Sequence, residues 1–259
     1  MHNAGFRALG INAVYVAFPL DPTQFDTGIR GLRAVDVAGF NLTVPHKSAI
    51  LPLLDHITPE ARAVGAVNTV RCDAQGMHGT NTDGEGYLRA LAEELSLAPQ
   101  GKRVLLLGAG GAARGIAYSL LAAAAGELII ANRSADKAVA LARELSGALP
   151  TAQVRGMGLD AVAGLAPDLL INATTVGMGD GQSPVELARV GVREAVSDIV
   201  YTPARTPLLA QAEALGLPHA NGIGMLLHQG CLAFAFWTGH EAPVGVMRRA
   251  LLAGLAARD

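Results

Sequence analysis

The sequence predicts an α/β protein of two domains, the second of which contains a doubly wound parallel sheet. Three observations support this prediction. From residue 101 onward, short apolar runs alternate with segments rich in helix-forming residues, which is typical of strands joined by crossover helices. The run at 104–107 is apolar at every position, as a strand buried on both faces requires. Residues 1–84 and the region after residue 221 lack this alternation, so they are expected to form the other domain.

The elements of the second domain follow one another closely. Apolar runs predict strands at 104–107, 127–131, 168–171 and 195–200. Runs of helix formers predict helices at 112–125, 136–145 and 207–215. Right-handed crossovers then place the strands in one parallel sheet. A helix at 85–95 is expected to connect the two domains.

The first domain has a different order of predicted elements. We expect helices at 3–9 and 59–65, an alternating strand at 12–18, a strand at 37–44 that ends before Pro45, and a strand at 68–72. The last part of the chain predicts helices at 224–237 and 243–257, which are expected to return to the first domain. The predicted domains are therefore residues 1–84 plus 222–259, and residues 85–221.

Composition excludes several classes of protein. The 259 residues carry 20 Lys plus Arg against 22 Asp plus Glu, and this even balance argues against a surface that wraps a nucleic acid. A hydrophobic fraction of 51% excludes disorder. Cys72 and Cys231 form neither a disulfide framework nor a metal-ligand spacing, and no segment has the pattern of a signal peptide or a bilayer span. We therefore expect a cytoplasmic protein without metal, nucleic-acid or membrane partners.

A glycine-rich turn follows the predicted strand at 104–107 and opens the next helix. It reads Gly108-Ala109-Gly110-Gly111-Ala112-Ala113. The first glycine allows a tight turn, the second lets the backbone approach a pyrophosphate, and the small residue Ala113 lets helix and strand pack closely. The anion would then lie on the unpaired N–H groups of the helix N-terminus. This order predicts a Rossmann-like dinucleotide-binding domain.

The residues after the second strand indicate which dinucleotide binds. An acidic residue there would hold the ribose hydroxyls of NAD. This sequence has Asn132, Arg133 and Ser134 at that point, with Lys137 one turn later. A guanidinium, a hydroxyl and an ammonium suit a 2′-phosphate, which predicts NADP as the cofactor.

Three segments of the first domain are dense in polar groups: 41–47, 66–69 and 78–84. Taken singly, a Thr-Asp-Gly run is typical of a helix cap, and a lone lysine is typical of a solvated face. Together, Lys47 and Asp83 could supply the proton and the charge stabilisation that reduction of a ketone to an alkoxide requires.

These motifs resemble those of the shikimate dehydrogenase family, the NADP-dependent enzymes of aromatic amino-acid (chorismate) biosynthesis. The matching motifs are Asn41-Leu-Thr-Val-Pro-His-Lys47, Gly65-Ala-Val-Asn68-Thr69, Asn81-Thr-Asp83-Gly84, the turn at 108–115, Asn132-Arg133-Ser134, Asn172-Ala-Thr-Thr175, Asp198-Ile-Val-Tyr201-Thr-Pro203 and Asn221-Gly-Ile-Gly-Met225-Leu-Leu-His-Gln229. They occur in the family's order along most of the chain.

The resemblance implies roles for individual residues. Lys47 and Asp83 would be the catalytic pair, with Lys47 as the acid and base. The substrate hydroxyls would be held by Thr43, Asn68, Asp83, Tyr201 and Gln229. The cofactor would be bound by Gly108, Ala109, Gly110, Gly111, Ala112, Asn132, Arg133, Ser134 and Lys137, with Thr174, Ile199, Gly222 and Met225 lining its nicotinamide end. The implied reaction is the reversible reduction of 3-dehydroshikimate to shikimate by a monomer or homodimer.

The sequence departs from the family's pattern at its beginning. The family carries a strand and a Ser-x-Ser-Pro segment ahead of the His-Asn that stands here as His2-Asn3. We expect either a start upstream of Met1 or a first domain with an unpaired sheet edge and two fewer contacts to the substrate carboxylate. Two alternatives follow: a quinate/shikimate or related cyclic-polyol dehydrogenase, or an NADP-binding protein with impaired turnover.

Overall fold

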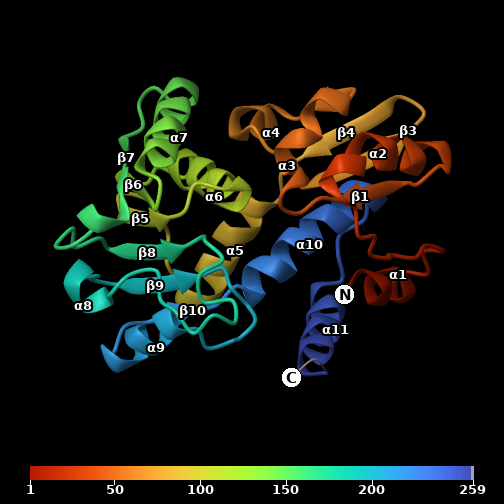
Figure 1. Cartoon of the computed structure of the whole chain (residues 1–259). Helices are drawn as coiled ribbons and strands as arrows, with labels where there is room; N and C mark the ends of the chain where they lie inside the picture. Colours follow the sequence, from red (N-terminus) through yellow and green to blue (C-terminus); the bar gives the residue numbers. More distant parts are fainter. Residues whose placement is uncertain (258–259) are drawn as a thin grey trace. The chain divides into compact units, whose positions relative to one another are not determined.

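The computed structural model describes residues 1–257, and the chain divides into two compact units (Figure 1). Unit 1 contains Met1–Thr82 and the chain from Leu227 onward, and unit 2 contains Asp83–Leu226. Residues 258 and 259, which end the first predicted domain, lie outside the described residues. Both units mix helices with a sheet, which confirms the predicted α/β class.

Unit 2 contains a six-stranded sheet in which every neighbouring pair is parallel. Its strands are β5 (Arg103–Leu107), β6 (Glu127–Asn132), β7 (Val154–Gly158), β8 (Leu169–Asn172), β9 (Ala195–Asp198) and β10 (His219–Ala220). Their spatial order is β10-β9-β8-β5-β6-β7. The chain leaves β5 in one direction through β6 and β7 and then returns to the other side of β5 with β8. This reversal creates a switch point between β5 and β8, where ligands bind in open parallel sheets.

Helices cover both faces of this sheet because successive strand side chains point to opposite sides. Val104 and Leu106 of β5 pack into a core with α5 (Asp83–Leu95), α6 (Gly111–Ala122) and α7 (Ala135–Ala148). Leu105 and Leu107 pack into a second core with α8 (Leu187–Val190) and α9 (Pro207–Ala214). All four leucine and valine side chains are fully buried, as the apolar run predicted.

Unit 1 contains a four-stranded sheet in the order β1-β3-β4-β2. Its strands are β1 (Gly39–Asn41), β2 (His56–Ile57), β3 (Thr69–Asp73) and β4 (Gly76–Thr80). Its core includes side chains from α2 (Phe25–Ala34) and α4 (Pro59–Val64). Another core joins α1 (His2–Ala8) to α10 (Ile223–Thr238) and α11 (Val244–Ala256). The Trp237 indole donates a hydrogen bond to the Val70 carbonyl at 2.9 Å, which ties α10 to β3.

The strand predicted at 12–18 is wrong, because this segment forms no ladder in the described structure. It is anchored at one residue, where Asn3 bonds the backbone of Tyr15 through both its amide oxygen and its amide nitrogen. Val14 is 74% exposed and Phe18 is 68% exposed. Alternation gives a segment strand propensity, but a strand also needs a partner to pair with, and in the described structure residues 12–18 pair with no strand.

The strand predicted at 37–44 is shorter than expected. Only Gly39–Asn41 pairs with β3, in antiparallel register with residues 69–71. The chain then turns through Val44 and Pro45, and His46–Ala49 forms the one-turn helix α3. Lys47 therefore lies on a short helix that follows this turn directly.

Candidate active site

Lys47 is positioned by the packing of its neighbours in unit 1. The ring of His46, the residue before it, stacks on Phe25 of α2 with centroids 4.7 Å apart. His46 Nε2 also lies 3.0 Å from the Leu20 carbonyl. On the other side, the Val67 N–H donates to the Lys47 carbonyl at 2.8 Å. The backbone of this one-turn helix is thus held at both sides, while the Lys47 side chain is only partly buried.

Asn68 connects its own segment to the start of α5. Its amide oxygen accepts hydrogen bonds from the Thr82 N–H and the Thr69 hydroxyl, both at 2.9 Å. Its amide nitrogen donates to the Thr82 hydroxyl at 3.0 Å. Asn68 and Thr82 are both buried. The predicted substrate residue Asn68 therefore fixes the residue that immediately precedes Asp83.

Asp83 is the first residue of α5, and it is 4% exposed. Its neighbour Gly84 lies against α6, since a Cβ at position 84 would overlap the Gly115 carbonyl and the Ser119 side chain. The first turn of α5 is thereby seated on the helix that follows the glycine-rich turn. Lys47 lies in unit 1 and Asp83 begins unit 2, so the pairing of the two groups stays a prediction.

The remaining predicted substrate residues are spread over both units. Thr43 is exposed in the turn before α3, and Gln229 is partly buried on α10, both in unit 1. Tyr201 is partly buried in the loop after β9 of unit 2. No cluster of three or more metal-binding side chains occurs among the described residues, and no helix in that part of the chain is long and apolar enough to cross a membrane.

The glycine-rich turn lies at the switch point between β5 and β8. Gly108 has φ of +113°, and a Cβ there would come within 2.8 Å of the Ala173 carbonyl, so only glycine fits. Around Gly110, by contrast, space for a Cβ is open. Gly110 is the N-cap of α6 and contributes no side chain, so no side-chain cap bonds the first N–H groups of this helix. These N–H groups and the positive end of the helix dipole form a site that suits a pyrophosphate.

The predicted 2′-phosphate residues lie at the carboxyl end of the neighbouring strand. Asn132 ends β6 and donates a hydrogen bond to the Ser134 carbonyl at 3.0 Å, which shapes the turn into α7. Arg133, Ser134 and Lys137 are exposed around the N-terminus of α7. Within residues 1–257, neither Arg133 nor Lys137 forms an ion pair, so both cations are available to an anion. An acidic side chain directly after β6 would favour an unphosphorylated ribose, and the residues that follow β6 directly include none.

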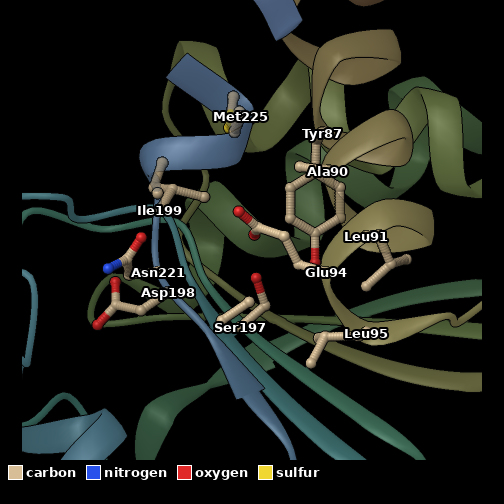
Figure 2. A pocket seen from close by; sticks show the side chains of 12 residues that line it. Tyr87, Ala90, Leu91, Glu94, Leu95, Ser197, Asp198, Ile199, Asn221 and Met225 are labelled. Carbon is tan, nitrogen blue, oxygen red and sulfur yellow. The ribbon is translucent and has the colours of Figure 1, made fainter. Parts of the chain in front are cut away.

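Three of the four residues predicted at the nicotinamide end line one small pocket of unit 2. Ile199, Gly222 and Met225 meet there with side chains of α5 and β9 (Figure 2). The enclosed space, about 10 Å³ for the centre of a water molecule, is far too small for a nicotinamide ring. This small enclosed space is therefore not the cofactor site. Burial raises the pKa of the Tyr87 phenol in its wall, which keeps that group protonated.

Three buried polar residues were missed as site residues, two at the carboxyl ends of β8 and β9 and one at the start of α9. They are Asn172, Asp198 and Thr206, and each is 0% exposed. Asn172 and Asp198 are register partners at the ends of adjacent strands, and their side chains bond at 2.9 Å. Asn172 comes directly after the apolar run at 168–171, and Asp198 lies within the strand predicted at 195–200. These two positions were a signal in the sequence, because the carboxyl ends of parallel strands share one edge.

Comparisons with known proteins agree along the chain. Sequence profiles match for the shikimate dehydrogenase substrate binding domain over residues 1–70, for shikimate/quinate 5-dehydrogenase over residues 90–174, and for the shikimate 5′-dehydrogenase C-terminal domain over residues 222–252. Among curated relatives, the shikimate dehydrogenase (NADP(+)) of Geobacter metallireducens is 47% identical over 260 residues. That alignment covers 98% of this chain and 91% of the relative.

Solved structures give the same picture. The shikimate 5-dehydrogenase of Thermus thermophilus, in complex with NADP(H) and shikimate, aligns with a TM-score of 0.87 at 34% identity. The quinate dehydrogenase of Corynebacterium glutamicum, in complex with NAD, aligns with a TM-score of 0.88 at 32% identity. Each alignment covers 97% of this chain and 92% of the other.

Proposed function

The chain belongs to the shikimate dehydrogenase family, and from this membership we propose that it catalyses the reversible, NADP-dependent reduction of 3-dehydroshikimate to shikimate. The observation that carries the proposal is 47% identity to a shikimate dehydrogenase (NADP(+)) over 98% of the chain. The reaction is a step in the biosynthesis of aromatic amino acids through chorismate. The protein is accordingly an oxidoreductase that acts on a CH–OH group.

The residues of unit 2 fit a dinucleotide. A Cβ at Gly108 would crowd the Ala173 carbonyl, so the turn requires glycine there. Gly110, the N-cap of α6, has no side chain to bond the first N–H groups of that helix. Arg133 and Lys137 would hold the 2′-phosphate beside the N-terminus of α7. When bound there, NADPH would supply the hydride for reduction of the substrate's C3 carbonyl carbon. Every residue that we assign to the cofactor lies in unit 2.

Lys47 and Asp83 would carry the proton chemistry. The Lys47 ammonium donates a proton to the alkoxide that forms when hydride reaches the carbonyl carbon, and it takes the proton back in the reverse direction. Asp83, held between the bonded residue Thr82 and the tightly packed Gly84, orients that ammonium. Both roles are proposals from the family motif.

The substrate hydroxyls would be held by Thr43, Tyr201, Gln229, Asp83 and Asn68. The bonding of Asn68 restricts how it takes part. Its amide oxygen already accepts from the Thr82 N–H, the Thr82 hydroxyl and the Thr69 hydroxyl. Its amide nitrogen also donates to the Thr82 hydroxyl at 3.0 Å. We therefore propose that these bonds hold the Asn68 side chain in a fixed orientation in which it meets the substrate.

Initial rates with two substrates and two cofactors test the proposed function. Reduction of NADP+ is followed by NADPH absorbance in the presence of shikimate and, separately, of quinate, and both series are repeated with NAD+. We expect shikimate and NADP+ to give the highest kcat/KM. A higher kcat/KM with quinate would favour the second candidate, a quinate/shikimate dehydrogenase, which the alignment to the quinate dehydrogenase supports. No turnover with either substrate would leave only an NADP-binding protein.

The choice of cofactor is tested separately by Arg133→Asp. Replacing the cation by an anion removes one charge-assisted hydrogen bond to the 2′-phosphate and adds repulsion, so affinity for NADP+ should fall by about 10- to 100-fold. Affinity for NAD+, which lacks this phosphate, should change far less. Arg143→Asp makes the same charge change on an exposed residue further along α7 and serves as the matched control. Equal losses for both cofactors would refute the assignment of Arg133.

A further inference from the structure

We propose that Asp198 is a positioning residue that ties together the two loops at the nicotinamide end of the cofactor site. The proposal rests on the proposed function, because it assumes that these loops, which follow β8 and β9, face the dinucleotide. Asp198 itself is fully buried and is not expected to touch the substrate or the cofactor. Figure 2 shows its carboxylate turned away from Tyr87 and Glu94 of the small pocket.

The Asp198 carboxylate accepts three hydrogen bonds from three parts of unit 2. Asn172, at the end of β8, donates its amide nitrogen to Oδ1 at 2.9 Å. The Val200 N–H, in the loop after β9, donates to the same oxygen at 3.0 Å. The Thr206 hydroxyl, at the start of α9, donates to Oδ2 at 2.7 Å. One carboxylate thus joins the end of β8, the end of β9 and the N-terminus of α9.

On the β8 side, Asn172, which is bonded to Asp198, in turn fixes the orientation of Thr174. The Asn172 amide oxygen accepts from the Thr174 hydroxyl at 2.7 Å and from the Thr174 N–H at 3.1 Å. Its amide nitrogen also donates to the Val176 carbonyl at 3.1 Å. Thr174 in turn lies against the glycine-rich turn, since a Cβ at Gly108 would meet its methyl group at 3.2 Å. The orientation of Thr174 therefore depends on Asn172, which Asp198 holds.

On the β9 side, the same carboxylate fixes both ends of the loop that contains Ile199 and Tyr201. One end is held through Val200, and the other through Thr206, whose hydroxyl also caps α9 by accepting from the Leu209 N–H at 3.3 Å. Ile199 then packs against Gly222, where a Cβ would overlap the Ile199 carbonyl. Asp198 consequently sets the position of the segment against which the start of α10 lies.

The pattern of donors indicates which substitution preserves the connection. In Asp198→Asn, the remaining oxygen can still accept from Asn172 and Val200. The new amide nitrogen would face the Thr206 hydroxyl, which has one lone pair beyond the one used by Leu209 and can accept. Asp198→Ala removes all three bonds: the Val200 N–H and the Thr206 hydroxyl lose their acceptor, while the Asn172 amide nitrogen keeps only its bond to the Val176 carbonyl. If the connection is what matters, the asparagine variant rescues the function that the alanine variant loses.

Binding of two ligands separates positioning from general destabilisation. NADP+ probes the whole site, whereas adenosine 2′,5′-bisphosphate probes only the adenosine end. In Asp198→Ala we expect affinity for NADP+ to fall about 10-fold or more and kcat to fall as well, while affinity for the bisphosphate stays within about 3-fold. Asp198→Asn should stay close to the wild type in all three measurements. If Asp198→Ala does not fold, the same measurements are made on two variants of Thr206. Thr206→Val removes the hydroxyl that bonds Asp198, and Thr206→Ser keeps it.

The matched control is Asp168→Ala. Asp168 precedes β8 at its opposite end, where its carboxylate accepts the Arg103 N–H at 2.8 Å. Its loss should leave the ratio of the two affinities unchanged. Equal losses for both ligands in Asp198→Ala, or no loss for either, would overturn the proposal, as would an asparagine variant as impaired as the alanine variant. A wild-type protein that binds NADP+ but does not oxidise shikimate would instead refute the proposed function.

Discussion

At the scale of a residue, the position of Lys47 depends on contacts made by its neighbours and its backbone. The stacking of His46 on Phe25 and the bond from Val67 to the Lys47 carbonyl fix the helix α3 from two directions. The Lys47 side chain itself is partly buried. The segment 41–47 could be recognised from the sequence because it concentrates polar groups. The stacking of His46 on Phe25 could not, because a contact between residues far apart in sequence leaves no local pattern.

Substitution of Lys47 tests its role as acid and base. Lys47→Ala should lower kcat by about 10²- to 10⁴-fold, the usual contribution of a positioned proton donor. Affinity for NADP+ should stay unchanged, since all residues assigned to the cofactor lie in unit 2. Lys47→Arg keeps the charge but gives up the proton poorly, so it should be nearly as slow. Ser48→Ala, at the exposed neighbour on α3, is the control. A Lys47→Ala enzyme of normal kcat would refute the role.

His2 gives a prediction about stability and pH. Burial, and next the charge of the N-terminus, lower the pKa of His2 to about 4, and its ring contacts Tyr15 and Trp237. Between pH 6.5 and 4 the unfolded chain therefore binds a proton that the folded chain does not, so stability should fall as the pH falls through this window, by up to about 3 kcal/mol.

The variant His2→Phe keeps a ring in this position and removes the titrating group. Urea unfolding over a series of pH values should show a shallower loss of stability in the variant than in the wild type. His240→Phe, at an exposed histidine, should leave the wild-type slope in place. Identical slopes for His2→Phe and the wild type would contradict the buried, neutral state of His2.

At the scale of elements, the contact between α5 and α6 has no room for another carbon atom. Gly84→Ala would force its methyl group against the Gly115 carbonyl, which is backbone and cannot rotate away. We expect a loss of about 1–3 kcal/mol in the free energy of unfolding, and a fall in kcat if the displaced turn carries Asp83 with it. Gly147→Ala in α7, where space is open, should instead stabilise by up to about 1 kcal/mol. Equal effects of the two substitutions on stability would contradict the tight contact.

The elements also show why some could be predicted and others could not. The β5 run and the glycine-rich turn are local patterns, and the structure has both where the sequence placed them. The residues at 12–18 alternate just as clearly, yet they form no strand, because a ladder depends on a second segment that alternation does not specify. The strand β7, in contrast, has no apolar run. It lies at the edge of the sheet, and Gly156 packs directly against the backbone of α7.

At the scale of the whole molecule, the order of motifs carried more information than any one of them. Lys47, Asp83 and Arg133 are ambiguous singly, but eight motifs in family order identified the family, which the 47% identical relative confirms. The bonding within the site was not accessible in this way. That Asn68 holds Thr82, or that Asp198 joins three segments, depends on atoms that only the folded chain brings within 3 Å.

The division of the chain into two units gives a prediction for the whole molecule. Because all assigned cofactor residues lie between Asp83 and Leu226, NADP+ alone should slow amide hydrogen exchange in unit 2, above all at 108–112 and 132–137. A ligand at 100 times its Kd stabilises the state that binds it by about 2.7 kcal/mol, which is ample for detection. Amides of β3 and β4 in unit 1 should exchange at the same rate with and without NADP+. Arg133→Asp, at the same NADP+ concentration, should lose the protection throughout unit 2. Equal protection of both units by NADP+ alone would show that the cofactor residues are assigned to too small a part of the chain.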